Sequence, residues 1–211
     1  MIMNFMEILM MNNPVRAFLQ KNVWARIFFK YTPQNIPVFD KVLEIGCWNG
    51  TWVRIIFDLF QPKHVDALDL DPYMVKLAIK RTKRYKERVA ISTGTVSKIK
   101  SPDENYDSVF GFWVLHHIPD WRWAVSEVNR VLKPNWLFYS EESFADFITH
   151  PFWRSIMSHI QEDRFNPDEY IEYLCSQGFE LIGSKIADRK SLRWKLFRQS
   201  LWLMVFRKID K

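Results

Sequence analysis

The sequence predicts an α/β fold, in which a doubly wound, mostly parallel sheet of seven strands is covered by helices on both faces. Short apolar segments alternate with helical patterns between residues 38 and 140, which is typical of parallel strands joined by helices. The first apolar run, Val42–Ile45, breaks at Gly46 and passes directly into a helical pattern. With 211 residues, 48% of them hydrophobic, the chain is long enough to bury a substantial core in one domain.

Two helices are predicted ahead of the sheet. Ile2–Met10 carries apolar residues at helical spacing, and Asn13 followed by Pro14 is typical of an N-cap and the first position of a second helix. We expect this second helix to end at about Lys30, because the two prolines of Thr32–Pro37 predict a loop. The two helices form either a lid over a ligand or a layer packed on the edge of the sheet.

The strands and helices of the central part follow in turn. The strands are predicted at Lys41–Ile45, His64–Leu70, Arg88–Ser92, Tyr106–Trp113 and Trp136–Ser140, and the helices at Thr51–Phe60, Asp71–Tyr85 and Trp121–Leu132. Asp71 is expected to cap the second of these helices because Pro72 follows it. The third helix has one apolar face, which predicts packing on the sheet, and Pro134 ends it.

After the fifth strand the alternation changes. Helices are predicted at Phe144–Ile160 and Pro167–Gln177, and a final pair of strands at Phe179–Ala187 and Leu201–Ile209. No internal repeat or long linker divides the chain, so a single domain is expected over residues 1–211. Its parts are an N-terminal helical lid (1–37), a ligand-binding core (38–140), a helical insertion (141–178) and a final strand pair (179–211).

Composition restricts the class of protein. The formal net charge of +6 allows an acidic partner, but small soluble enzymes often carry such a charge. The two cysteines, Cys47 and Cys175, show neither a CxxC motif nor a disulfide framework, so a cytoplasmic location is expected. The apolar N-terminal residues are interrupted by Asn4 and Glu7 and are shorter than the roughly 20 residues that span a bilayer.

Candidate ligand-binding residues follow the first four predicted strands. In an open parallel sheet, ligands bind outside the carboxyl ends of the strands, at the point where the strand order reverses. The Gly46–Gly50 turn follows the first strand, and Asp69 lies roughly 20 residues further on, where a carboxylate can accept both ribose hydroxyls. Gly94–Val96 follows the third strand and Phe112–Trp113 the fourth. These positions predict a nucleoside-binding site.

A dinucleotide is not the expected ligand. Its G-x-G-x-x-G loop needs a middle glycine so that the backbone can approach a pyrophosphate, whereas this chain has Gly46, Trp48 and Thr51 at the three positions. A nicotinamide-dependent oxidoreductase is therefore the disfavoured reading. A nucleoside without a pyrophosphate fits the turn better.

Four ordered motifs resemble the class I S-adenosylmethionine-dependent methyltransferases, of the small-molecule type related to the quinone-biosynthesis enzymes. V-L-E-I-G-C-W-N-G resembles the first motif of that family, V-L-D-I-G-C-G-x-G, and A-L-D-L-D-P-Y-M resembles its second. Y-D-S-V-F-G-F-W-V-L-H-H-I-P-D resembles the segment after the fourth strand, and E-V-N-R-V-L-K-P-N-W-L-F the segment before the fifth. The resemblance covers Val42–Ser140 and implies a Rossmann-like methyltransferase fold.

The resemblance also implies the cofactor, S-adenosylmethionine, with S-adenosylhomocysteine as its product. The residues that it assigns to cofactor binding are Glu44, Gly46, Cys47, Trp48, Asn49, Gly50, Asp69, Leu70, Thr95, Val96, Phe112 and Trp113. The reaction of the family is an in-line methyl transfer from a sulfonium, for which an enzyme mainly supplies alignment and exclusion of water. Aromatic rings such as Trp48 or Trp113 can face the sulfonium cation.

Three positions depart from the pattern of the family. Trp48 replaces the second glycine of the first motif, so its ring either forms a wall of the cofactor pocket or weakens cofactor binding; we expect a wall. Asn135 and Trp136 replace a Gly-Gly pair, a mild change because Asn tolerates left-handed backbone geometry. Thr95 replaces an Asp near the adenine amine, where a hydroxyl still forms a weaker hydrogen bond.

A general base is needed only if the acceptor must lose a proton. His117 is the candidate base because it lies just past the fourth strand, although His116 and His117 can equally pack or cap the next helix. Glu141 and Glu142 either line the acceptor pocket or lie on the surface. No metal site is expected, because adjacent histidines should point to different faces and no third ligand is suitably spaced.

The expected partner is a small-molecule acceptor, apolar or lipid-like, because the N-terminal helices and the insertion are rich in Met, Phe and Trp. Arg189–Arg198 interleaves five basic residues with Leu, Trp and Phe, which suits either a solvated connection or peripheral membrane contact. A nucleic-acid partner is disfavoured, and the oligomeric state is left open. The alternative functions are an RNA methyltransferase and a cofactor-binding protein with little catalysis.

Overall fold

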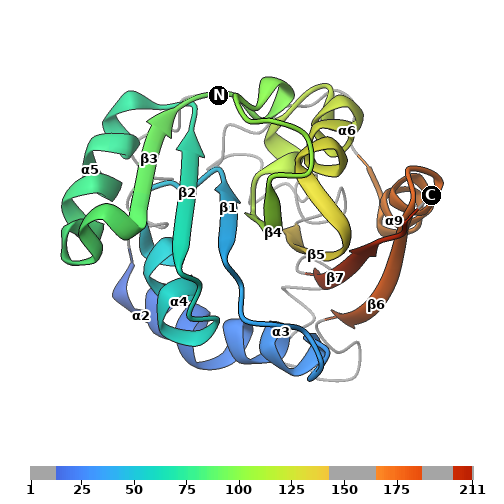
Figure 1. The fold of residues 1–211 in the computed structure, drawn as a ribbon, viewed down its shortest axis with the longest axis horizontal. Helices are drawn as coiled ribbons and strands as arrows, with labels where there is room; N and C mark the ends of the chain where they lie inside the picture. The colour runs from blue at the N-terminus through green and yellow to red at the C-terminus, as the bar shows by residue number, and fades with distance from the viewer. Residues whose placement is uncertain (1–12, 143–164, 187–201, 211) are drawn as a thin grey trace, which may run out of the picture.

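A computed structural model describes residues 13–142, 165–186 and 202–210. Its centre is a seven-stranded sheet in the order β3-β2-β1-β4-β5-β7-β6 (Figure 1). The strands are β1 (Lys41–Ile45), β2 (His64–Asp69), β3 (Val89–Thr93), β4 (Tyr106–Phe112), β5 (Leu132–Glu142), β6 (Phe179–Ile186) and β7 (Trp202–Lys208). The predicted doubly wound, mostly parallel sheet is confirmed.

The strand order reverses between β1 and β4. From β3 to β5 every neighbouring pair is parallel, and Ile45 at the end of β1 pairs with Leu68 on one side and Gly111 on the other. β7 is antiparallel to both β5 and β6. The carboxyl ends of β1 and β4 therefore flank the switch point at which such sheets bind ligands.

The helices agree with most of the predicted bounds. They are α2 (Pro14–Leu19), a π-helical turn (Gln20–Trp24), α3 (Ala25–Tyr31), α4 (Thr51–Leu59), α5 (Pro72–Thr82), α6 (Trp121–Val131) and α9 (Pro167–Ser176). Asn13 and Asp71 cap their helices as expected, by accepting the N–H groups of Val15 and Tyr73. The predicted helix at Phe144–Ile160 lies outside the described residues.

Two predicted bounds were wrong. The helix expected to reach Tyr85 changes to a 3-10 helix at Lys83–Arg88. β5 begins at Leu132 instead of Trp136, because a shift of register against β4 lets Asn135 adopt a left-handed conformation with φ of 66° without ending the pairing.

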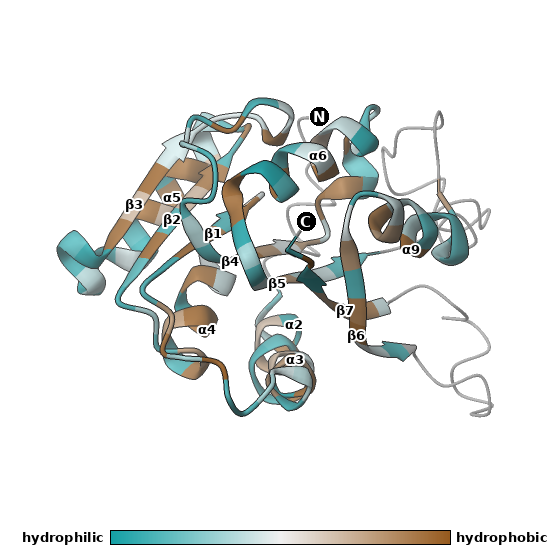
Figure 2. Ribbon diagram, turned by 45° about the vertical axis from the view of Figure 1, so that its right-hand side comes forward, coloured by the Kyte–Doolittle hydropathy of each residue, from teal (hydrophilic) through white to brown (hydrophobic). Residues whose placement is uncertain are grey.

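Both faces of the sheet are covered by packed side chains, and hydrophobic residues follow one another along β7 (Figure 2). On one face Phe28 of α3 is fully buried against the rings of Phe112 and Tyr139. On the other, Trp121 of α6 packs on Tyr170 of α9. α3 therefore packs on one face of the sheet, whereas packing on its edge was one of the two alternatives expected for the N-terminal segment. Among the described residues, no helix has the length and apolar character that crossing a bilayer requires.

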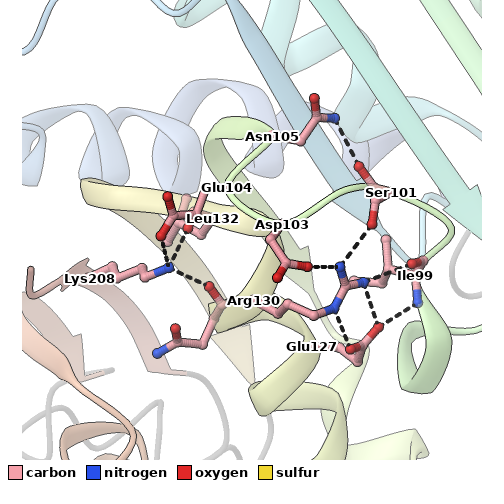
Figure 3. A network of polar contacts seen from close by, with 10 residues as sticks. Ile99, Ser101, Asp103, Glu104, Asn105, Glu127, Arg130, Leu132 and Lys208 are labelled. Carbon is pink, nitrogen blue, oxygen red and sulfur yellow. Dashed lines mark hydrogen bonds and ion pairs between the residues drawn. The ribbon is translucent and has the colours of Figure 1, made fainter. Parts of the chain in front are cut away.

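Arg130 fastens α6 to the segment between β3 and β4 (Figure 3). Its guanidinium donates five hydrogen bonds, which go to both carboxylate oxygens of Glu127, to Asp103 and to the carbonyls of Ile99 and Ser101, at 2.7–3.0 Å. Glu127 also accepts the backbone N–H of Ile99 at 2.9 Å. The arginine of the R-V-L-K-P motif is therefore a structural residue at the amino ends of β4 and β5.

Candidate functional site

A cavity of about 240 Å³ opens at the carboxyl ends of β1, β2, β3 and β4. Its lining is mostly apolar and comes from the segments that follow these strands. The lining residues are Gly46, Trp48, Leu68, Asp69, Leu70, Asp71, Gly94, Thr95, Val96, Ser97, Phe112, Trp113, Val114, His117, Ile118 and Pro119. We call it the large cavity. It lies at the predicted switch point.

The turn after β1 brings backbone close to this cavity. Gly46 has φ of 67°, and a Cβ atom there would lie 2.6 Å from Cγ2 of Val114, so only glycine fits. Trp48 also has positive φ, 48°, in a region that strains a bulky side chain. Gly50 behaves differently, because it faces Ala78 of α5 and does not line the large cavity. Its role is the close packing of α4 on α5.

Asp69 ends β2 with its carboxylate held in place. Oδ2 accepts the backbone N–H of Trp48 at 2.7 Å, and Oδ1 accepts that of Asp71 at 2.9 Å. Burial raises the pKa of Asp69, and the two N–H donors oppose this shift. Each oxygen keeps a lone pair with which it can accept a hydroxyl, so the geometry suits a diol such as a ribose.

A second, small cavity of about 30 Å³ lies on the other side of the Gly46–Trp48 turn. It is lined by Arg16, Gln20, Glu44, Gly46, Cys47, Trp48, Asn49, Thr51, Trp52 and Phe112. Trp48, Gly46 and Phe112 line both cavities. The small cavity is therefore separated from the large one by the turn and by the ring of Trp48.

Glu44 provides a buried acid to the small cavity. It is 1% exposed, and its Oε2 has no hydrogen-bond partner among the described residues. Burial, helped by the negative charge of Asp69, raises the pKa of Glu44 well above its usual value. Cys47 beside it is buried, and burial raises the pKa of its thiol, so Cys47 is a small core residue rather than a nucleophile.

Arg16 is a site residue that sequence reasoning missed. Its guanidinium carbon lies 4.4 Å from the ring centre of Trp113 and 5.8 Å from that of Trp24. Burial lowers the pKa of Arg16, while the charge of Glu141 opposes the shift, and the side chain stays charged. Nothing in the sequence distinguishes Arg16 from the other 29 Lys and Arg residues, since only the fold brings α2 to the end of β4.

The segment after β4 is held by the end of β5. Trp113 has φ of 58°, and its N–H donates to the carbonyl of Glu141 at 2.7 Å. Glu142 accepts the N–H of Leu115 at 3.0 Å and binds Nδ1 of His116 at 2.6 Å. Glu142 is fully buried, which excludes the surface alternative for it, and its contacts hold the segment that carries His117 into the large cavity.

The rings of His116 and His117 lie with their centres 4.1 Å apart, so they do not point to different faces as expected. The reason is that both lie in one short 3-10 turn, Leu115–His117. Among the described residues, no three potential metal ligands come together.

The structure gathers most of the predicted site residues. Those in the large cavity are Gly46, Trp48, Asp69, Leu70, Thr95, Val96, Phe112, Trp113 and His117, and those found only in the small cavity are Glu44, Cys47 and Asn49. The donor set suits S-adenosylmethionine: Asp69 for the ribose, an apolar wall for the base, and a buried cation and acid for an amino-acid end. The binding role of each residue stays a prediction.

Residues 43–139 match the family described as a methyltransferase domain. The demethylmenaquinone methyltransferase of Bacillus licheniformis is 25% identical over 123 residues, which cover 58% of this chain and 52% of the relative. The chain thus spans about half the length of the curated relatives that it matches.

Solved structures share the fold over more of the chain. One belongs to the complex between the Haloferax volcanii Trm112 methyltransferase activator and the putative methyltransferase, with a TM-score of 0.74 and 17% identity over 93% of this chain and 94% of that one. Another is phosphoethanolamine N-methyltransferase 2 of Haemonchus contortus, solved with S-adenosylmethionine, with a TM-score of 0.68 and 17% identity over 88% of this chain and 52% of that one.

Proposed function

We propose that the protein transfers the methyl group of S-adenosylmethionine to a small, apolar or lipid-like acceptor, because residues 43–139 match a methyltransferase domain and the fold is shared with solved S-adenosylmethionine-dependent methyltransferases. The observation that carries the proposal is the meeting of Asp69 with the Gly46–Trp48 turn in one cavity, at the end of adjacent strands.

The cofactor would be held from both sides of the turn. Asp69 would accept the ribose hydroxyls, and Thr95 and Val96 would contact the adenine. Glu44 and Arg16 would bind the amino-acid end in the small cavity. When bound, S-adenosylmethionine supplies a methyl group on a sulfonium, which is a good leaving group. The aromatic wall of Phe112 and Trp113 excludes water from this part of the site.

Two observations support an apolar acceptor. Relatives from Bacillus licheniformis and Staphylococcus carnosus are named demethylmenaquinone methyltransferases, after a quinone. The large cavity has apolar residues along the segment after β4, among them Val114 and Ile118. His117 lines the same cavity and is the proposed base for an acceptor that must lose a proton.

Two partner predictions concern Arg189–Arg198, which lies outside the described residues. Peripheral membrane contact through this segment would bring the site to a lipid-like acceptor. RNA methylation, the alternative, requires affinity for RNA that falls steeply with salt. A cofactor-binding protein without catalysis would bind S-adenosylmethionine and transfer no methyl group.

Calorimetric titration with S-adenosylmethionine and S-adenosylhomocysteine tests the proposal. We expect both to bind, and we expect S-adenosylhomocysteine to form when an apolar quinol acceptor is added. The absence of binding by either nucleoside would overturn the proposal. Binding without turnover on quinol, amine or RNA acceptors would favour the non-catalytic alternative.

Asp69→Ala should weaken binding of S-adenosylhomocysteine by at least about 1 kcal/mol, roughly fivefold, because charge-assisted hydrogen bonds to the ribose are lost. Asp40→Ala is the matched control. Asp40 pairs with Lys63 on the surface at the other end of β1, where its loss should leave the affinity unchanged. Equal affinities of the Asp69→Ala variant and the unmodified protein would show that Asp69 does not bind the ribose.

A further inference from the structure

The backbone conformation of Trp48 is unfavourable for a residue other than glycine. Its φ of 48° lies in the left-handed region. The hydrogen bond from its N–H to Asp69 fixes this geometry at 2.7 Å. A glycine would adopt the same backbone without strain. What distinguishes tryptophan from glycine at this strained position is its indole ring.

The ring lines both cavities and carries an unused donor. The indole Nε1 of Trp48 is buried and has no hydrogen-bond partner among the described residues. A buried donor without a partner destabilises the folded protein, because it has lost its hydrogen bonds to water. A ligand that accepts a hydrogen bond from this N–H would remove that cost.

The small cavity, which Trp48 also lines, has groups of complementary charge in its wall. Arg16 contributes a guanidinium that stacks on the ring of Trp113. Glu44 contributes an acid whose Oε2 lacks a partner among the described residues. A volume of about 30 Å³ suits the compact polar end of a ligand and is too small for a ring. A cation, an N–H donor and an acid in so small a space match the carboxylate and ammonium of an α-amino acid.

We propose that Trp48 determines specificity: its indole N–H binds, together with the guanidinium of Arg16, the α-carboxylate at the methionyl end of the cofactor. The inference rests on the proposed function and deepens it. Trp48 then substitutes a side-chain donor for the close backbone approach that a glycine permits. The protein should consequently discriminate strongly against 5′-methylthioadenosine, which keeps the nucleoside and the thioether but lacks the amino-acid group.

The test is a calorimetric comparison of S-adenosylhomocysteine with 5′-methylthioadenosine. The unmodified protein should bind S-adenosylhomocysteine at least roughly tenfold more tightly. Trp48→Phe keeps an aromatic ring and removes the N–H. It should therefore weaken the binding of S-adenosylhomocysteine by roughly 5- to 20-fold and change the affinity for 5′-methylthioadenosine by less than about twofold. Arg16→Gln, on a partly exposed helix, should give the same pattern.

Trp136→Phe is the matched control, because Trp136 packs against Phe39 at the amino end of β5 and should leave both affinities unchanged. Circular dichroism verifies that each variant is folded. Equal weakening of both nucleosides by Trp48→Phe, or no weakening of either, overturns the inference. If the unmodified protein binds both nucleosides equally, the proposed function stands and the inference fails. If it binds neither, both are overturned.

Discussion

At the amino ends of β4 and β5, Arg130 uses all five of its N–H groups in hydrogen bonds within the protein. At the carboxyl ends of the same sheet, polar atoms of Glu44 and Trp48 are buried with no hydrogen-bond partner among the described residues, and Glu141 is fully buried. Buried polar groups thus have hydrogen-bond partners within the protein at the amino ends of these strands, whereas some lack them at the carboxyl ends in the part of the chain that the structure describes.

This difference separates stability from binding. A network in which every polar group has a hydrogen-bond partner stabilises the fold, because removing one partner leaves the other groups buried without hydrogen bonds. Buried groups that lack partners in the folded chain lower its stability and become useful only when a ligand completes them. Substitutions at the Arg130 end should therefore change stability alone, and those at the cavity end should change ligand binding or pH dependence.

Arg130→Ala should have the largest effect, a loss of about 2–3 kcal/mol in the free energy of unfolding, because Glu127, Asp103 and two carbonyls lose their common donor. Denaturant unfolding measures the loss. The affinity for S-adenosylhomocysteine, measured by calorimetry below the unfolding transition, should not change.

Lys80→Ala, on the exposed face of α5, is the control for removal of a cation and should alter neither quantity by more than about 0.5 kcal/mol. A large fall in cofactor affinity for Arg130→Ala would contradict the separation of the two ends.

Glu141→Gln tests the carboxyl ends of the strands through the pH dependence of stability. Burial raises the pKa of Glu141 to about 8. Between about pH 5 and pH 8 the folded protein therefore holds a proton on Glu141 that the unfolded chain has released. The free energy of unfolding consequently falls as the pH rises through this range. The unmodified protein should lose at least about 1 kcal/mol relative to Glu141→Gln between these pH values, by denaturant unfolding.

Glu180→Gln, a change to a carboxylate that faces Arg207 near the surface, should leave the pH dependence as it is in the unmodified protein. Parallel stability curves for the unmodified protein and Glu141→Gln would mean that Glu141 is ionised in the fold and has found a partner.

Asn135→Gly should have the smallest effect. Asn135 has a left-handed conformation at the end of the sheet near Arg130, where no ligand is involved. Glycine relieves the strain but adds freedom to the unfolded chain, so the free energy of unfolding should change by less than about 0.5 kcal/mol. Asn135→Ala should instead destabilise by about 1 kcal/mol in the same denaturant assay. Equal stabilities of these two variants would show that the left-handed backbone at this position carries no strain.

The order of strands and helices was predictable because it depends on local patterns. Asp71 and Pro72 mark the start of α5, and the apolar face of Trp121–Val131 marks α6. The early start of β5 was not predictable, because pairing with β4 overrides the effect of Pro134 on the local conformation. The end of α5 was missed for a similar reason: the residues after Thr82 favour a helix but form a tighter 3-10 turn.

The site shows the same limit. Asp69 and Gly46 could be identified because spacing along the chain places them at the ends of adjacent strands. Gly50 belongs to the same motif, yet its position against Ala78 depends on how α4 and α5 pack. Arg16 lies about 30 residues before the motif and reaches the cavity through the tertiary fold, which no local pattern encodes.

The π-helical turn at Gln20–Trp24 has a mechanical consequence for the N-terminal helix. Residues four apart in a regular α-helix drift around the axis by about 40°, so three such steps would rotate Arg16 well away from the face that buries Phe28. A π turn holds more residues and removes much of this rotation. Arg16 and Phe28 therefore share one edge of a single rod, one at the small cavity and the other in the core.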